Sequence, residues 1–169
     1  MAFLRRNLSN CPRNVKADCY KTLVRPILEY GCAVWDPHHK NDIESLEKIQ
    51  KRAARFVTGN YDLHHGSTKI NMSKLLWKPL EERRACNKLN LLYKSRKGFI
   101  DLPPSQLLKE NPRKPLNFAI PASSVDSHLY SFYPNTMRMW NSLADIGKTL
   151  STPNSFNEYL QHTTVRTSY

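Results

Sequence analysis

Apolar residues recur at helical spacing near the N-terminus, across residues 11–37. Positions three and four residues apart share one face of a helix, so the pattern predicts a helix near residues 12–35. Pro26 lies inside the pattern and predicts a kink, because proline lacks an N–H and its ring clashes with the preceding turn. Gly31 is expected to end the helix with a positive φ. The predicted buried stripe consists of Val15, Cys19, Leu23, Ile27 and Tyr30.

A second helix is predicted over residues 41–57. Asn41 and Glu44 resemble a capping box, and Gly59 stands just past the end. The expected buried face consists of Ile43, Leu46, Ile49 or Gln50, Ala53, Phe56 and Val57. The opposite face is basic, with Lys48, Lys51, Arg52 and Arg55 at spacings of three and four.

A third helix is predicted over residues 79–97, opened by Pro79 and ended by Gly98. Its apolar face is expected to consist of Leu80, Ala85, Leu89 and Leu92. Its remaining surface is crowded with basic residues that include Arg83, Arg84 and Lys88. The chain therefore carries two amphipathic helices whose polar faces are predominantly cationic.

Five prolines between residues 101 and 121 exclude a long helix, so this stretch is expected to be an extended linker. Short helices are predicted after it, at 134–143 and, with Thr152 as N-cap, at 153–160. The predicted fold is mainly α: a small bundle of three principal helices, a Pro-rich linker and short C-terminal helices. The predicted domains are 1–100, 101–121 and 122–169.

The net charge of +12 is unevenly distributed. Residues 1–114 hold 23 of the 26 lysines and arginines and 11 of the 14 acidic residues, so this part carries all of the excess. A polyanionic partner is one interpretation, and a merely solvated basic surface is the other. Since the charges fall on helix faces, we favour nucleic acid. The candidate phosphate-binding residues are Lys48, Lys51, Arg52, Arg55, Arg83, Arg84 and Lys88.

Sites for catalysis or metal binding are not expected. The pairs His38-His39 and His64-His65 lack the ligand spacings of zinc sites, and no nucleophile motif or Gly-rich phosphate loop is present. The three tryptophans can stack on bases or pack in a core, and their apolar neighbours favour packing.

No apolar run approaches the roughly 20 residues of a membrane helix, and the N-terminus lacks a signal-peptide core. We therefore expect a protein without membrane partners, inside the cell in cytoplasm or nucleus.

Several stretches carry a resemblance to one family. The run LVRPILEY at 23–30, followed by VWDP at 34–37, resembles the segment just after the polymerase core in reverse transcriptases of jockey-like non-LTR retrotransposons. The similarity continues through IESLEKIQKRAARFVTGNY at 43–61 and LLWKPLEERRACNKLNLLYKSRKGFIDLP at 75–103. The patch YSFYPNTMRMWNSL at 130–143 is similar to that family's terminal motif.

The resemblance implies that the chain is the thumb and C-terminal region of such an RNA-directed DNA polymerase. It implies contact with RNA template and RNA–DNA hybrid, and an upstream palm domain as partner. The parent enzyme uses Mg²⁺ held by an adjacent Asp pair, but this chain contains no Asp-Asp dipeptide. The chain itself is thus expected to need no cofactor and to have no polymerase activity.

A second interpretation remains open: a degenerate or domesticated helical module that binds protein. The apolar residues Phe3, Leu4 and Leu8 predict that the N-terminal segment lacks partners within the chain and that the chain begins inside a longer protein.

Overall fold

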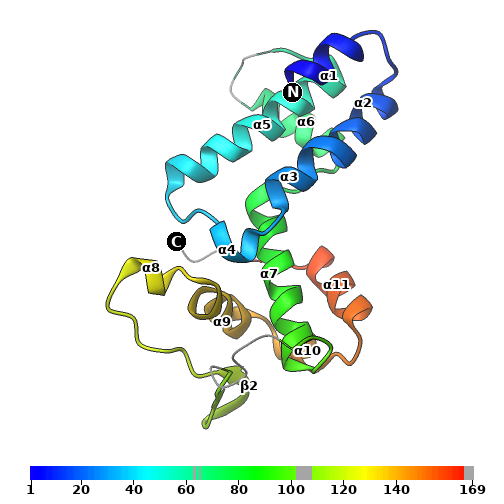
Figure 1. Cartoon of the computed structure of the whole chain (residues 1–169). Coiled ribbons are helices and arrows are strands. Elements are labelled where there is room, and N and C mark those ends of the chain that lie inside the picture. The colour runs from blue at the N-terminus through cyan, green and yellow to red at the C-terminus, as the bar shows by residue number, and fades with distance from the viewer. Residues whose placement is uncertain (63, 65, 102–107, 166–169) are drawn as a thin grey trace. The chain divides into compact units, whose positions relative to one another are not determined.

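A computed structural model describes residues 1–62, 64, 66–101 and 108–165. Helices dominate this part of the chain (Figure 1). The paired strands in it are the short β1 (Glu110–Asn111) and β2 (Lys114–Phe118), which form an antiparallel hairpin. The prediction of a mainly α fold is confirmed.

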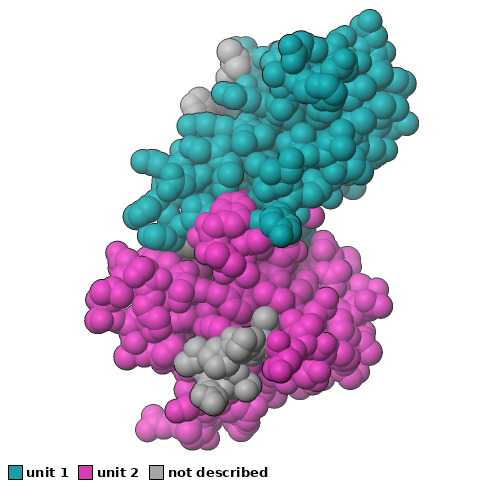
Figure 2. Space-filling model, viewed as in Figure 1, with its two compact units in different colours: residues 1–30, 37–81 teal, residues 31–36, 82–169 magenta. Residues whose placement is uncertain are grey.

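The contacts divide the chain into two compact units (Figure 2). Unit 1 consists of Met1–Tyr30 and Pro37–Glu81, and unit 2 of Gly31–Asp36 and Glu82–Tyr169. This division differs from the predicted one at 101–121. The reason is that α7 (Leu80–Arg96) contributes Ala85, Leu89 and Leu92 to the same core as the C-terminal helices.

The predicted helix at 12–35 is interrupted. It consists of α2 (Arg13–Cys19), the π-helical turn η1 (Tyr20–Val24), α3 (Arg25–Glu29) and, in unit 2, α4 (Cys32–Trp35). The wide turn comes just before Pro26, whose missing N–H and bulky ring make a regular α turn unfavourable there. Gly31 has the expected positive φ, 65°.

The predicted buried stripe of this segment is wrong at four of its five positions; the fifth, Cys19, is half-buried and packs against the cluster that contains Tyr20. Ile27 and Tyr30 are 72% and 84% exposed, and Val15 and Leu23 are exposed as well. The buried residues of α2, η1 and α3 are instead Ala17, Tyr20 and Leu28, and Cys32 is buried in α4. Two apolar faces compete in this sequence, and the face with Tyr20 is buried because its ring and hydroxyl both find partners in unit 1.

The N-terminal helix α1 (Ala2–Asn7) is only partly as expected. Leu4 is buried in a cluster with Tyr20, Ala53 and Phe56, so it does have partners within the chain. Phe3 is exposed.

Helix α5 (Lys40–Thr58) matches its prediction closely. Gly59 ends it in the left-handed conformation, and the expected apolar face is buried except for Leu46 and Ile49, which are half-buried. The predicted capping box is wrong, because the N-cap is His39 and Asn41 lies within the first turn. Helix α5 packs against α2 and against α6 (Ser67–Lys74), a helix for which no prediction was made from the sequence.

The core of unit 2 is aromatic. The rings of Tyr93 and Phe156 stack with centroids 4.3 Å apart, Trp140 is fully buried beside them, and the Tyr93 hydroxyl donates to the Leu150 carbonyl at 2.9 Å. The helices that supply this core besides α7 include α9 (Phe132–Ser142) and α11 (Pro153–His162), both close to their predicted bounds. Thr152 caps α11 as expected: its hydroxyl accepts the Ser155 N–H at 3.2 Å. Two shorter helices complete the unit, α8 (Asp126–Leu129) and α10 (Asp145–Thr149).

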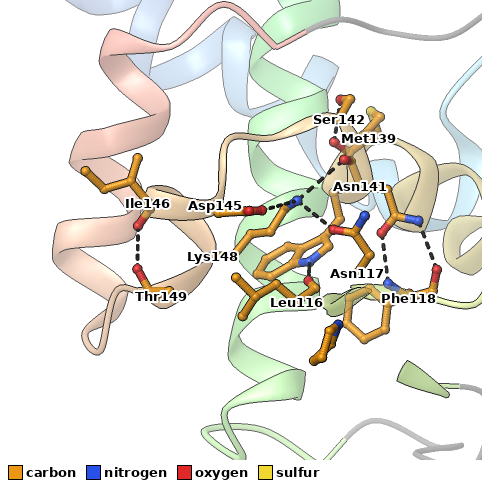
Figure 3. A network of polar contacts seen from close by, with 12 residues as sticks. Leu116, Asn117, Phe118, Met139, Asn141, Ser142, Asp145, Ile146, Lys148 and Thr149 are labelled. Carbon is orange, nitrogen blue, oxygen red and sulfur yellow. Dashed lines mark hydrogen bonds and ion pairs between the residues drawn. The ribbon is translucent and has the colours of Figure 1, made fainter. Parts of the chain in front are cut away.

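The expected linker contains a fixed hairpin between residues 110 and 118, whereas residues 102–107 lie outside the described part. Side chains hold β2 in place (Figure 3). The Asn141 amide accepts the Phe118 N–H and donates to the Phe118 carbonyl, both at 2.9 Å. The Trp140 indole N–H donates to the Leu116 carbonyl at 2.9 Å, and the buried Lys148 ammonium donates to Asn117 at 2.7 Å. The bonds from Asn141 and Trp140 satisfy backbone groups of β2 that a neighbouring strand would bind in a larger sheet.

We predict that Asn141→Ala destabilises unit 2 by about 2 kcal/mol or more, because both backbone groups of Phe118 lose their partner. Thermal unfolding measures the loss, and amide exchange at Phe118 should accelerate. The control is Asn154→Ala at an exposed position of α11. Equal stability of the two variants would show that Asn141 does not hold the strand.

Candidate nucleic-acid interface

Four of the candidate residues lie together on one face of α5. Lys48, Lys51 and Arg52 are exposed and Arg55 is half-buried. Their spacing places them opposite the buried face, which includes Ala53 and Val57. Within the described part of the chain, no carboxylate forms an ion pair with any of the four. Their charges are therefore available to an external anion.

Arg55 is positioned by the neighbouring helix. Its guanidinium donates from Nη2 to the Thr68 hydroxyl of α6 at 3.2 Å, while its buried Nε has no hydrogen-bond partner. The same helix carries the exposed Lys69, which lines a cavity together with Lys51. Lys69 thus extends the cationic surface of α5. It was not predicted, since residues 62–73 are polar and lack clear helical periodicity.

Ala53 and Ala54 are fully buried. Because both alanines face the core, these small residues do not open the backbone of α5 to a ligand. Contacts to the basic face must therefore come from its long side chains.

The basic residues of α7 lie in a different environment. Arg84 and Lys88 are 0% and 2% exposed, and both bind the buried carboxylate of Asp36. The Arg84 Nε lies 2.6 Å from Asp36 Oδ1, and the Lys88 ammonium contacts Oδ2. The prediction that Arg84 and Lys88 form a phosphate-binding surface is corrected accordingly: their charges are used inside unit 2.

Arg83 is half-buried on the same helix, in unit 2. The structure therefore gathers Lys48, Lys51, Arg52 and Arg55 on one surface of unit 1, whereas Arg84 and Lys88 are buried within unit 2. The residue that distinguishes the buried cations of α7 from the exposed cations of α5 is Asp36, which pairs with Arg84 and Lys88. It stands 48 residues before Arg84, so no local sequence pattern connects the two residues.

Among the described residues, no group of three histidine, cysteine or acidic side chains is arranged to hold a metal ion. In the same part of the chain, no helix combines the length and hydrophobicity needed to cross a bilayer.

We predict that Asp36→Asn destabilises the protein by about 3–5 kcal/mol, because it leaves two buried cations without a counter-charge. The matched control is Asp145→Asn: this carboxylate also pairs with a buried ammonium, that of Lys148 at 3.2 Å, but is itself 75% exposed. Its loss should cost about 1 kcal/mol or less. Urea unfolding measures both values, and similar small losses would show that the Asp36 cluster contributes little.

Comparison of the chain with models of protein families, with curated proteins and with solved structures gives no match. An assignment of function therefore rests on the residues described above and on the resemblance of the sequence segments.

Proposed function

We propose that the basic face of α5 binds the phosphates of RNA template and RNA–DNA hybrid, and that the chain is the thumb and C-terminal part of a non-LTR retrotransposon reverse transcriptase. The observation that carries the proposal is the contrast between the two basic helices. Arg84 and Lys88 are buried and share one carboxylate inside the protein, whereas Lys48, Lys51 and Arg52 are exposed without an acidic partner in the described residues. The sequence resemblance supports the proposed family, and the exposed basic face of α5 supports the proposed contact with phosphates.

Such contacts are independent of base sequence, because lysine and arginine on a phosphate carry no information about the base. Affinity in this mode falls steeply with salt, since each neutralised phosphate releases condensed counterions. A thumb that follows a moving template needs this tolerance.

An exposed apolar surface on unit 1 supports a protein partner next to the nucleic acid. Leu23, Ile27 and Tyr30 are all more than half exposed on η1, α3 and the residue after it. In the proposed enzyme, the upstream palm domain is the partner that would cover them. The same surface favours the second candidate function, a module that binds protein without nucleic acid.

A salt titration tests the phosphate contacts. We predict that Lys48→Gln, Lys51→Gln and Arg52→Gln together flatten the log–log salt dependence of hybrid binding by about two to three units. All three side chains are exposed, and glutamine keeps helix propensity, so the fold should persist. Fluorescence anisotropy with a labelled RNA–DNA hybrid measures the slope.

The matched control replaces Lys94, Lys109 and Lys114, which are exposed in unit 2, with glutamine. It has the same net charge as the α5 triple variant. If both variants flatten the slope equally, binding reflects total charge, and the proposed face is refuted. If neither changes it, the protein-binding function is favoured.

A second prediction concerns catalysis. The purified chain should extend no primer on an RNA template with Mg²⁺ or Mn²⁺, because the sequence lacks an adjacent Asp pair for the two metal ions. As a positive control, a separately purified palm fragment from a related enzyme is added, and primer extension is then expected. Extension by the chain alone, if abolished by Asp-to-Asn variants, would reveal a catalytic site outside this scheme.

A further inference from the structure

A cavity of about 770 Å³ lies in unit 1 beside the basic face of α5. Its volume is in the range of small-molecule binding sites. The apolar part of its wall includes Met72, Leu76, Trp77 and Pro79. Lys51 of α5 and Lys69 of α6 also line the cavity. Lys51 therefore belongs both to the proposed phosphate-binding face and to the cavity.

Leu76 has an unusual backbone at this cavity. Its φ is +52°, the left-handed conformation that glycine adopts at little cost and leucine does not. The local hydrogen bonds explain why the conformation is required. The Leu76 N–H donates to the Ser73 carbonyl and the Trp77 N–H to the Met72 carbonyl, both at 3.0 Å, which is the pattern of a Schellman motif at the end of α6.

The side chain of Leu76 makes no buried contact that would offset the cost of this backbone conformation. It is 91% exposed, so the burial that could offset the strained backbone is absent. Strain kept by an exposed apolar residue at the wall of a cavity points to a ligand that covers it.

The indole of Trp77 is held rigidly beside Leu76. It stacks on Tyr20 with ring centroids 4.7 Å apart and an angle of 24° between the planes. The Tyr20 hydroxyl donates to Gln50 at 3.0 Å, and the Gln50 amide donates to the Lys78 carbonyl at 2.9 Å. The Glu47 carboxylate, the acidic group on the wall, accepts the Glu81 N–H at 3.1 Å. An aromatic surface fixed in this way suits a flat ligand.

We propose that this cavity holds one unpaired nucleotide of a bound strand, with its base on Trp77 and Leu76 and its phosphate on Lys51 and Lys69. The proposal rests on the phosphate-binding role of α5, because a strand that lies along that face passes the cavity at Lys51. The exposed area of the wall is mostly apolar, so the base is held through its flat face and any base is accepted.

Two strands of about 20 nucleotides test the proposal: one of thymidine, and one in which every base is absent but every phosphate remains. Wild-type protein should bind the thymidine strand about tenfold more tightly, as expected for one stacked base. The key variant is Leu76→Gly. It should reduce this ratio to about two or less, and it should raise the thermal midpoint by about 4 °C because the backbone strain is relieved.

Leu76→Ala is the matched control, since it removes the same contact but keeps the strained backbone. It should lose the base preference without the gain in thermal midpoint. Lys69→Gln should weaken both strands equally and leave the ratio unchanged.

A ratio near one for the wild-type protein, or an unchanged ratio in Leu76→Gly, overturns the proposal. The salt dependence of hybrid binding separates the two hypotheses: if the α5 variant still flattens the slope, only the cavity assignment fails. An acidic amphipathic peptide that binds wild type but not Leu76→Gly, together with a ratio near one, would replace the nucleotide by a protein partner.

Discussion

The contact between Tyr20 and Trp77 organises unit 1. The two stacked rings join η1 to the segment after α6, and the Tyr20 hydroxyl adds α5 through Gln50. Because Gln50 faces the core, its helix has one orientation in which the buried amide is satisfied. That orientation turns Lys48, Lys51 and Arg52 outward. The cationic surface and the cavity wall are therefore both fixed by one aromatic pair and its hydrogen bonds.

Whether the basic side chains of a helix stay exposed or become buried depends on the acidic groups that its neighbours place beside them. On α5 three cationic side chains are exposed to water. On α7, Arg84 and Lys88 both pair with the buried carboxylate of Asp36. Removing a charge from water is costly unless a partner and hydrogen bonds replace the water. Asp36 supplies the counter-charge and one hydrogen bond to each cation, whereas Nη1 and Nη2 of Arg84 are buried without a hydrogen-bond partner. The basic side chains of the two helices thus differ in environment: Lys48, Lys51 and Arg52 stay at the surface, whereas Arg84 and Lys88 are buried.

The sequence predicted those features that local periodicity determines. Helix α5, its apolar face, the cap at Gly59 and the Thr152 cap of α11 all depend on residues a few positions apart. It did not predict features that depend on distant partners. Asp36 and Arg84 are far apart in the chain, and nothing near Tyr20 indicates that its face will be buried in preference to that of Ile27. The hairpin at 110–118 was missed because side chains from α9, rather than a further strand, satisfy backbone groups of Leu116 and Phe118.

The buried phenol of Tyr93 makes the stability of unit 2 depend on pH in the alkaline range. Burial raises the pKa of the Tyr93 phenol above its ordinary value of 10.0, because a phenolate would lack solvation there. The unfolded chain loses this proton near pH 10, while the folded chain keeps it until a higher pH. Folding therefore keeps its full stability below about pH 10 and loses part of it as the pH rises further. Burial raises the pKa of the Tyr133 phenol as well, which acts in the same direction, so alkali weakens unit 2 through its aromatic interior.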